Sequence, residues 1–492
     1  MDTAGEIQVP ISLLGGRIEV VSIDTDERVS ELVVLASKAF GRNIASLVDS
    51  GGHILSSATR VRDICLRDGD TCSAIISSER IFSTGFAFAV IRCDGSVATW
   101  GNPDFGGDNS ALQGQLRQVL QIFSTAGAFA ALKSDGSVIT WGRKGLGGNS
   151  SAVQEHLDSG VKHVFSTSYA FAALKDDGSV VTWGDPEFGA DSSAVKGHLH
   201  GEVECMFSNA HSFAAKRRDG TIVTWGRHDF GGDSSSVRAS IQGGVRHIYS
   251  TDYAFAAVKS DGSVVTWGSG SHGGCSLAVQ KELQQGVTCV FSNKSAFAAL
   301  RSDGSVVTWG SPAHGGNSSG ASGQLQGEVV QIASNDYAFA ARKANRTLVT
   351  WGHHDYGGDS SAVREQLQDV QSIFSTEGAF AALKSNGSVV AWGHLNYGGS
   401  SAAVSDRLRG DVQCIFSTQA AFAALKCNGS VVTWGNELYG GCSLSVAEQL
   451  RGDVQSISAS GGAFAATKAD GSIVSWGPAE LGGEIPAWLE VL

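Results

Sequence analysis

Residues 373–413 read IFSTEGAFAALKSNGSVVAWGHLNYGGSSAAVSDRLRGDVQ, and this stretch recurs with small changes over most of the chain. Each copy carries one Trp-Gly pair, and successive pairs lie 41 or 42 residues apart. A fixed period of this length indicates a repeat architecture, in which each unit buries its apolar face against its neighbours. The register tryptophans are Trp100, Trp141, Trp183, Trp225, Trp267, Trp309, Trp351, Trp392, Trp434 and Trp476. The sequence therefore predicts ten stacked units.

The repeats account for residues 81–492 and leave a separate domain at residues 1–80. A chain of 492 residues is too long for one ordinary hydrophobic core, so a division of this kind is expected. The 64 glycines recur at fixed points of the repeat, and they therefore mark tight turns and not low complexity.

Composition narrows the class of protein. The net charge is −12 and no basic stripe is present, which argues against a surface that follows nucleic-acid phosphates. The nine cysteines are scattered and never form a C-x-x-C pair, which favours a reducing compartment and argues against a zinc site. No apolar run is long enough to cross a membrane. We expect a soluble cytoplasmic protein, with the nucleus as an alternative, that uses no metal or cofactor and binds neither nucleic acid nor membrane.

The first domain shows the order strand, hairpin, helix and further strands. Residues 7–14 and 17–23 alternate as two paired strands. Residues 29–40 place their apolar side chains on one face of a helix. Shorter strands are expected at residues 46–49 and 71–76. This order is that of a β-grasp fold.

Residues 6–77 resemble ubiquitin in the order of these elements and in residues 47–76, which read LVDSGGHILSSATRVRDICLRDGDTCSAII. The resemblance implies a ubiquitin-like module whose apolar recognition patch comprises Leu14, Val48 and Ile75. The alternative interpretation is that these are ordinary strand residues. Residues 77–80 contain no Gly-Gly pair, so we expect the module to dock to partners and not to be conjugated.

Each repeat unit contains three expected strands, which in the second unit are residues 122–125, 128–133 and 137–142. Asp135 and Gly136 separate the last two strands, and Asp-Gly or Asn-Gly stands at this point in nine of the ten units. This dipeptide is typical of a two-residue type I′ hairpin, in which both residues take a positive φ.

The seventh unit has Asn345 and Arg346 at this turn, and Arg pays a steric penalty there, so we expect the weakest hairpin. After Trp-Gly, a Gly-Gly-Asp-Ser-Ser segment precedes a short apolar pattern, as in residues 359–367. Val363 and Leu367 are spaced as on a helix of about two turns capped by Asp or Ser. A fourth strand would fit the same space.

The repeated Asp-Gly-Ser-Val-x-x-Trp-Gly core resembles the repeats of the regulator of chromosome condensation family. That family forms seven-bladed β-propellers, so the resemblance implies a mainly β, propeller-like array. Ten units exceed seven blades, and Gly-Gly-Asp-Ser-Ser replaces the Gly-Gln-Leu-Gly of the family. A closed ring of ten, a seven-plus-three arrangement and an open superhelix all remain possible, and we favour the ring because the spacing shows no break.

The sequence shows no catalytic constellation. The histidines never form H-E-x-x-H, no Lys follows the glycines as in a phosphate-binding loop, and no general base can be named. We therefore expect no enzyme activity. A Lys or Arg precedes every hairpin, and a solvated flank explains these cations better than an anionic partner does. The loops after Trp-Gly vary most, and the best partner-binding candidates among them are Arg227, His228, Phe230, His353, His354 and Tyr356.

The combination favours a non-enzymatic protein-interaction scaffold. Ubiquitin-like and regulator-type repeats together look like pieces of the large HECT ligases, which implies ubiquitin-pathway partners and a client protein. We expect the chain not to be the ligase itself, since its sequence leaves no room for a HECT domain. Two alternatives remain, a guanine-nucleotide exchange factor for a small GTPase and a purely architectural repeat protein.

Overall fold

The structure is a computed structural model that describes residues 6–13, 18–24, 27, 29–40, 44–48, 61, 71–76, 80–92 and 94–484. The turn between the two expected strands at residues 7–14 and 17–23 lies outside the described residues.

In the described residues, the N-terminal domain is a four-stranded sheet with one α-helix. Its elements are β1 (Glu6–Leu13), β2 (Ile18–Asp24), α1 (Val29–Phe40), β3 (Ile44–Val48) and β4 (Cys72–Ile76). The strand order is β2-β1-β4-β3, with β1 and β4 parallel at the centre. The described core unites the inward side chains of the strands with one face of α1, as the sequence pattern predicts, and it comprises Val9, Ile11, Val21, Ile23, Val29, Leu32, Ala36, Leu47, Val61 and Cys72.

The rest of the described chain consists of ten three-stranded antiparallel sheets, so the protein is mainly β, as predicted. The first strands are β5 (Arg80–Ser83), β8 (Val119–Ser124), β11 (Val161–Ser166), β14 (Val203–Ser208), β17 (Val245–Ser250), β20 (Val287–Ser292), β23 (Val329–Ser334), β26 (Val370–Ser375), β29 (Val412–Ser417) and β32 (Val454–Ala459). The second strands are β6 (Ala87–Ile91), β9 (Ala128–Lys133), β12 (Ala170–Lys175), β15 (Ser212–Arg217), β18 (Ala254–Lys259), β21 (Ala296–Arg301), β24 (Ala338–Lys343), β27 (Ala379–Lys384), β30 (Ala421–Lys426) and β33 (Phe464–Lys468). The third strands are β7 (Val97–Gly101), β10 (Val138–Gly142), β13 (Val180–Gly184), β16 (Ile222–Gly226), β19 (Val264–Gly268), β22 (Val306–Gly310), β25 (Leu348–Gly352), β28 (Val389–Gly393), β31 (Val431–Gly435) and β34 (Ile473–Trp476).

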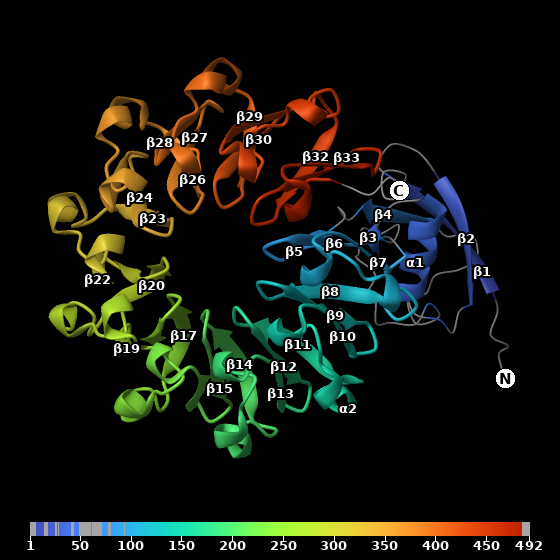
Figure 1. Ribbon diagram of the computed structural model, residues 1–492, viewed down its shortest axis with the longest axis horizontal. Helices are drawn as coiled ribbons and strands as arrows, with labels where there is room; N and C mark the ends of the chain where they lie inside the picture. The colour runs from blue at the N-terminus through green and yellow to red at the C-terminus, as the bar shows by residue number, and fades with distance from the viewer. Residues whose placement is uncertain are drawn as a thin grey trace.

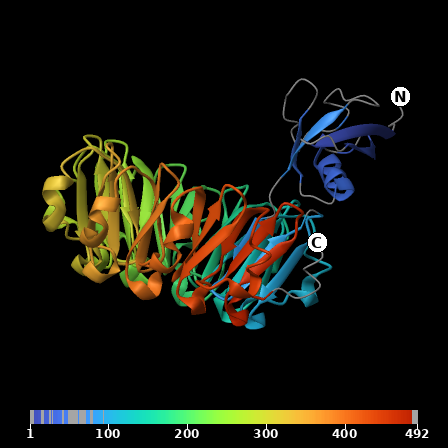
Figure 2. The same cartoon turned by 90° about the horizontal axis from the view of Figure 1, so that it is seen from above.

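The sheets stand side by side in a ring, and the first strand of a unit lies nearest the centre, as β17, β20 and β26 show (Figure 1). Seen from the side, the strands run across the thickness of the ring (Figure 2). The loops that connect the strands are therefore gathered on two opposite faces.

Short 3₁₀ helices follow the third strands. The first set follows Trp-Gly directly and comprises η2 (Pro103–Phe105), η4 (Lys144–Leu146), η6 (Pro186–Phe188), η8 (His228–Phe230), η10 (Gly270–His272), η12 (Pro312–His314), η14 (His354–Tyr356), η16 (Leu395–Tyr397), η18 (Glu437–Tyr439) and η20 (Ala479–Leu481). The second set comprises η3 (Ser110–Leu112), η5 (Ser151–Val153), η7 (Ser193–His198), η9 (Ser235–Ser240), η11 (Leu277–Val279), η13 (Ser319–Gln324), η15 (Ser361–Gln366), η17 (Ala402–Leu408) and η19 (Leu444–Val446), and η5 continues into α2 (Gln154–Leu157).

The expected short helix after Gly-Gly is present as a 3₁₀ helix, and the described units contain no fourth strand. Ser360 is the N-cap residue and its side chain makes no cap bond, but Asp359 Oδ1, one residue earlier, accepts a hydrogen bond from Ser361 N at 2.8 Å. Val363 N then donates to Ser360 O at 3.1 Å, which is the tighter 3₁₀ pattern. Leu367 is 2% exposed and packs against the sheets in the core. The segment therefore has to turn back to the sheets within a few residues.

The hairpin between the second and third strands also differs from the expected type I′ turn. Lys133 N donates to Ser137 O at 2.9 Å, so the loop contains the three residues 134–136. Gly136 has a φ of +77°, whereas Asp135 keeps a negative φ. The Asp135 carboxylate accepts a hydrogen bond from Ser137 N at 2.9 Å, and this contact holds the aspartate in the ordinary region. The turn is the three-residue hairpin in which only the last loop residue is left-handed.

Arg346 occupies the left-handed position of this hairpin in the seventh unit, with a φ of +65°. Its guanidinium Nη1 donates to Ser385 Oγ of the next unit at 2.9 Å. A side chain in this conformation costs free energy that glycine avoids. We predict that Arg346→Gly raises the free energy of unfolding by about 0.5–1 kcal/mol, the strain relieved exceeding the flexibility gained by the unfolded chain. Urea unfolding of this variant beside Arg346→Ala, which keeps the strain, tests the prediction, and equal stability of the two variants would refute it.

The ring is closed. The indole N–H of Trp100 in the first unit donates to Gly482 O in the last unit at 3.0 Å. Phe88 and Trp100 also pack with Ala463 and Ala465 of the last unit in one core cluster. Figure 1 shows the strands β32 and β33 beside β5 and β6. The preferred ring of ten units is correct, and the seven-plus-three and open arrangements are excluded.

The same indole bond joins every unit to the one before it, and each tryptophan stacks on the phenylalanine of its own second strand. Trp309 Nε1 donates to Gly273 O at 3.0 Å, and Phe297 and Trp309 stack with ring centroids 5.1 Å apart. Gly273 has a φ of +102°, and a Cβ there would lie 2.5 Å from Cδ2 of Phe297. Only glycine can bring its carbonyl this close to the indole.

We predict that Gly273→Ala lowers the free energy of unfolding by at least about 2 kcal/mol, from backbone strain and overlap with Phe297. Gly270→Ala in the same 3₁₀ helix is the matched control, because the nearest atom to a Cβ there is 3.7 Å away. Thermal and urea unfolding measure both variants. Equal effects of the two substitutions would contradict this account of the junction between units.

Candidate functional site

Two loops of every unit meet on one face of the ring, here called the loop face. They are the residues between the first and second strands and the 3₁₀ helix after Trp-Gly. In the eighth unit, Thr376 Oγ1 donates to Tyr397 O at 2.8 Å and His394 N donates to Gly378 O at 3.0 Å. The first of these bonds recurs in all ten units through a Thr, Asn or Ser side chain. The loop face is therefore held in a fixed geometry.

One position of this face varies sharply in charge around the ring. It is the residue after the Thr, Asn or Ser, which is Gly85, Ala126, Ser168, Ala210, Asp252, Lys294, Asp336, Glu377, Gln419 and Gly461 in chain order. Several neighbouring members of this set are linked by backbone bonds, such as Glu377 N to Gln419 O at 2.9 Å. Charge is confined to the fifth to eighth units.

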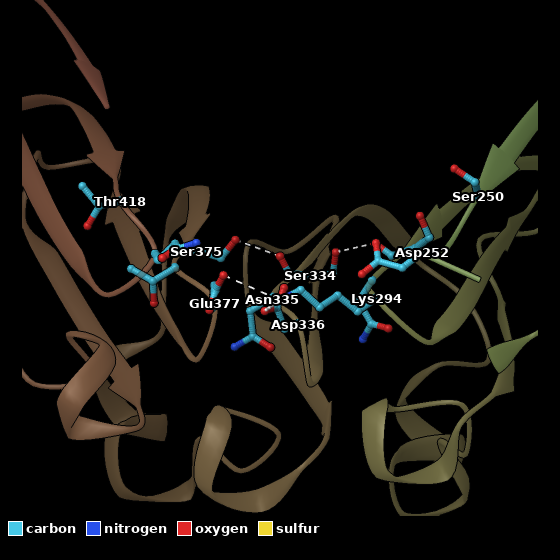
Figure 3. A pocket seen from close by; sticks show the side chains of 13 residues that line it. Ser250, Asp252, Lys294, Ser334, Asn335, Asp336, Ser375, Glu377 and Thr418 are labelled. Atoms are coloured by element: carbon cyan, nitrogen blue, oxygen red, sulfur yellow. Dashed lines mark hydrogen bonds and ion pairs between the residues drawn. The ribbon is translucent and has the colours of Figure 1, made fainter. Parts of the chain in front are cut away.

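These four charged residues, Asp252, Lys294, Asp336 and Glu377, form what is here called the charged hollow. Lys294 Nζ lies 2.5 Å from Asp336 Oδ2 and 3.6 Å from Glu377 Oε1. Figure 3 shows Lys294 reaching from its own unit toward Asp336. The four residues line an open cavity of about 500 Å³. Three carboxyl groups thus share one ammonium group.

Burial shapes the protonation of this group. The pKa of Asp336 is raised to about 6, first because the carboxyl is buried and then because Glu377 and Asp252 lie nearby, although Lys294 acts in the opposite direction. Burial likewise raises the pKa of Asp252. Burial disfavours the charged form of Lys294, but its three acidic neighbours outweigh that effect and raise its pKa. At neutral pH the hollow is therefore mainly ionised and carries excess negative charge.

Aromatic side chains flank the charged hollow on the loop face. The first aromatic run spans the third to fifth units and comprises Tyr169, Phe188, His211, Phe230, Tyr253 and His272. The second aromatic run spans the sixth to eighth units and comprises His314, Tyr337, His353, Tyr356, His394 and Tyr397. Ring centroids lie 5.1 Å apart for His211 and Tyr253, and 4.9 Å apart for Tyr356 and His394. All twelve rings are half-buried.

Burial keeps some of these histidines uncharged. The pKa of His211 is lowered to about 4 by burial and by the nearby Arg227 guanidinium. Burial also lowers the pKa of His314. Both imidazoles therefore act at neutral pH as aromatic surfaces and not as cations.

Four of the six loop residues predicted to bind a partner lie in or beside these runs. The Arg227 guanidinium lies over the Phe230 ring, 4.8 Å from its centroid. His353 and Tyr356 contact each other with centroids 4.9 Å apart. The fourth-unit pair and the seventh-unit pair share the loop face, but the fifth and sixth units separate them. The pairs therefore do not form one contiguous patch by themselves.

The other two predicted loop residues are engaged differently. His228 Nε2 lies 3.0 Å from Asp233 Oδ2, and His354 Nε2 lies 3.1 Å from Asp359 Oδ2. Both imidazoles are 77% exposed. Each histidine contacts an aspartate of its own unit, and neither belongs to an aromatic run.

The predicted ubiquitin-like patch remains a prediction. Leu14 lies outside the described residues, and Val48 and Ile75 are placed only as backbone positions of β3 and β4. Those two strands are antiparallel neighbours, with Val48 opposite Ser73 and Ile75 opposite Ser46.

The cations that precede the hairpins lie on the opposite face of the ring, here called the hairpin face. Lys133 pairs with Asp135 of its own turn at 3.2 Å, and Arg217 pairs with Asp219 at 2.8 Å. These short-range pairs fit the expectation of a solvated hairpin flank.

The sequence did not predict the charged hollow, nor the aromatic residues in the loops between the first and second strands. Asp252, Lys294 and Asp336 each stand about one repeat length apart, so no local motif joins them. The signal was the change from Gly or Ala to charge at one fixed repeat position. Tyr253 and Tyr337, at the next position, show the same contrast with Gly127.

The described residues include no group of three or more His, Cys, Asp or Glu side chains that could hold a metal ion. The helices of the described ranges also include none long and apolar enough to cross a membrane.

No protein-family model matches this chain, and no curated protein matches it. Solved structures do match. The ectodomain of the Physcomitrella patens receptor kinase CR4 is 16% identical, with 56% of this chain and 73% of that chain covered and a TM-score of 0.32. Prp20p from Saccharomyces cerevisiae, the yeast RCC1, is 13% identical, with 65% and 82% covered and a TM-score of 0.32. A protein designed on ubiquitin is 19% identical over 15% of this chain and 92% of its own, with a TM-score of 0.14.

Identities and TM-scores this low carry no argument about a partner or an activity. The ring is defined by the pairing of its strands and by the contact between its first and last units.

We predict that Asp336 titrates near pH 6 and that Lys294→Met raises its pKa further, because the substitution removes the only cation of the hollow. Carbon-13 NMR of labelled aspartate carboxyls measures both values, and Asp261 on the hairpin face, whose pKa is lowered by its bonds to Ser263, is the internal reference. Titration of Asp336 at or below its ordinary value of 3.8 would show that the carboxyl is not buried as described.

The sign of the linked stability follows from these values. The folded chain binds more protons than the unfolded chain between the ordinary pKa of 3.8 and about 6. The contribution of Asp336 to stability is therefore fully present below pH 3.8 and is lost as the pH rises through about 6.

Proposed function

We propose that this chain is a non-enzymatic scaffold that binds a client protein on the loop face of its ring and connects the client to the ubiquitin pathway through its N-terminal domain. The observation that carries the first part is the gathering of charged and aromatic side chains on one face of neighbouring units. Tyrosine and arginine dominate binding energy at protein interfaces, and half-buried rings on a rigid support lose little entropy on binding.

The second part rests on the N-terminal domain. Its sheet order β2-β1-β4-β3 and the helix α1 suit a ubiquitin-like module. A module of this kind would dock to a ubiquitin-ligase assembly or another component of the pathway through Leu14, Val48 and Ile75. The ring would then present the client to that assembly.

Matched variants of the full chain test the two parts separately. Tyr337→Ala with Tyr356→Ala removes two rings of the second aromatic run, and Leu14→Ala with Val48→Ala and Ile75→Ala removes the proposed patch. Lys133→Ala with Lys175→Ala on the hairpin face is the control. Partners captured by chemical cross-linking are quantified by mass spectrometry for each variant.

We predict that the loop-face variant loses its client at least about tenfold and keeps the ubiquitin-pathway partners, whereas the triple variant shows the reverse. The control should lose neither class. A partner set that no variant changes would refute the scaffold. A small GTPase that binds the ring and releases nucleotide faster in its presence would replace the proposal with an exchange factor.

A further inference from the structure

The charged hollow contains more carboxyl groups than cations, and it lies where backbone hydrogen bonds join neighbouring loops. Asp252, Asp336 and Glu377 face a single cation, Lys294, around an open cavity of about 500 Å³. Backbone hydrogen bonds from Asp252 N to Lys294 O at 3.1 Å and from Asp336 N to Glu377 O at 3.1 Å tie the loops together. Within each of these two pairs, the backbone positions that carry the charged side chains are therefore fixed relative to each other.

Lys294 reveals which chemistry the hollow accepts. Its ammonium group contacts Asp336 and approaches Glu377 to 3.6 Å, so a primary ammonium fits between carboxylates of neighbouring units. One ammonium group leaves the remaining carboxylates without a full counter-charge. A second cation from outside would meet less repulsion than one entering a balanced site.

Aromatic rings border the same carboxylates. Tyr397 and Tyr439 line a smaller cavity of about 220 Å³ together with Glu377 and Gln419. Tyr253 follows Asp252 directly in the chain and contacts the next ring of the first aromatic run. Carboxylates beside aromatic faces attract guanidinium and ammonium groups through ion pairs and cation–π contacts.

We propose that the loop face of the fifth to eighth units binds an arginine- or lysine-containing segment of the client protein, whose cationic side chains enter the charged hollow beside Lys294. This inference rests on the proposed scaffold function and adds the chemistry of the segment that the scaffold recognises. The apolar parts of that segment lie on the second aromatic run. The charge complementarity follows from three carboxylates and one ammonium group, and it suits a basic segment and not an acidic one.

The test uses the full chain and a fluorescent peptide in which arginines alternate with glycine and tyrosine, with a glutamine-for-arginine peptide as its partner. Fluorescence polarisation measures the dissociation constant at an ionic strength of about 0.15 M, where non-specific attraction is screened. The site variant is Asp336→Asn with Glu377→Gln. The control is Asp261→Asn with Asp303→Asn, which removes the same charge from the hairpin face. Asparagine already stands at that hairpin position in Asn386 and Asn428, so the turn is preserved.

We expect the site variant to weaken arginine-peptide binding at least about tenfold, and the control less than about twofold. Lys294→Met should strengthen binding, because it removes the competing cation. Equal losses in site variant and control would overturn the proposal in favour of net-charge attraction, and so would equal binding of the glutamine peptide.

Two further outcomes separate this inference from its premise. A site variant that loses the peptide but still captures the client at the level of the unchanged chain overturns the inference and leaves the scaffold function intact. Sedimentation that shows a dimer of this chain, lost in the site variant, would assign the face to a second copy of the chain and overturn the assignment to a client.

Discussion

The ring depends on one contact between neighbours, the hydrogen bond from each tryptophan indole to a glycine carbonyl of the preceding unit. It is made in all ten units, including the pair Trp100 and Gly482 that joins the two ends of the repeat array. A buried donor without a partner costs about 1–3 kcal/mol. In the closed ring every one of these buried indoles has a glycine carbonyl as its partner, and no unit differs in this position.

The residues of the loop face can vary from unit to unit without affecting this contact. The phenylalanine and small residues of the second strand and the tryptophan of the third strand pack in the core between units. The residues after the Thr, Asn or Ser position lie outside this core. Asp252 and Ala126 occupy equivalent places, and both donate their backbone N–H to the next unit. Charge can therefore be introduced in some units without disturbing the ring. The asymmetry of the face arises from this freedom and not from a change of fold.

Much of the fold could be predicted because the period repeats the same signal. The second strand was expected at residues 128–133, and β9 spans Ala128–Lys133. The hairpin type was not predictable from Asp-Gly alone, because that pair also suits the three-residue loop once the Asp135 carboxylate bonds to Ser137. The contact between the first and last units could not be predicted either, because no local pattern shows that Trp100 bonds to Gly482. Arg346 was recognised because a positive φ is a property of its own position.

The candidate site was harder to predict for a related reason. Each unit contributes one residue to the charged hollow, and proximity is created only by the ring. Asp336 and Glu377 belong to different units, yet their loops share a backbone hydrogen bond of 3.1 Å. Burial of the Asp336 carboxyl, and to a smaller extent its repulsion from Glu377, disfavours the charged form in the unbound protein, and the raised pKa of Asp336 reflects that cost. A cation that enters the hollow relieves that repulsion without reorganising the loops, so the cost borne by the free ring becomes part of the affinity for a basic partner.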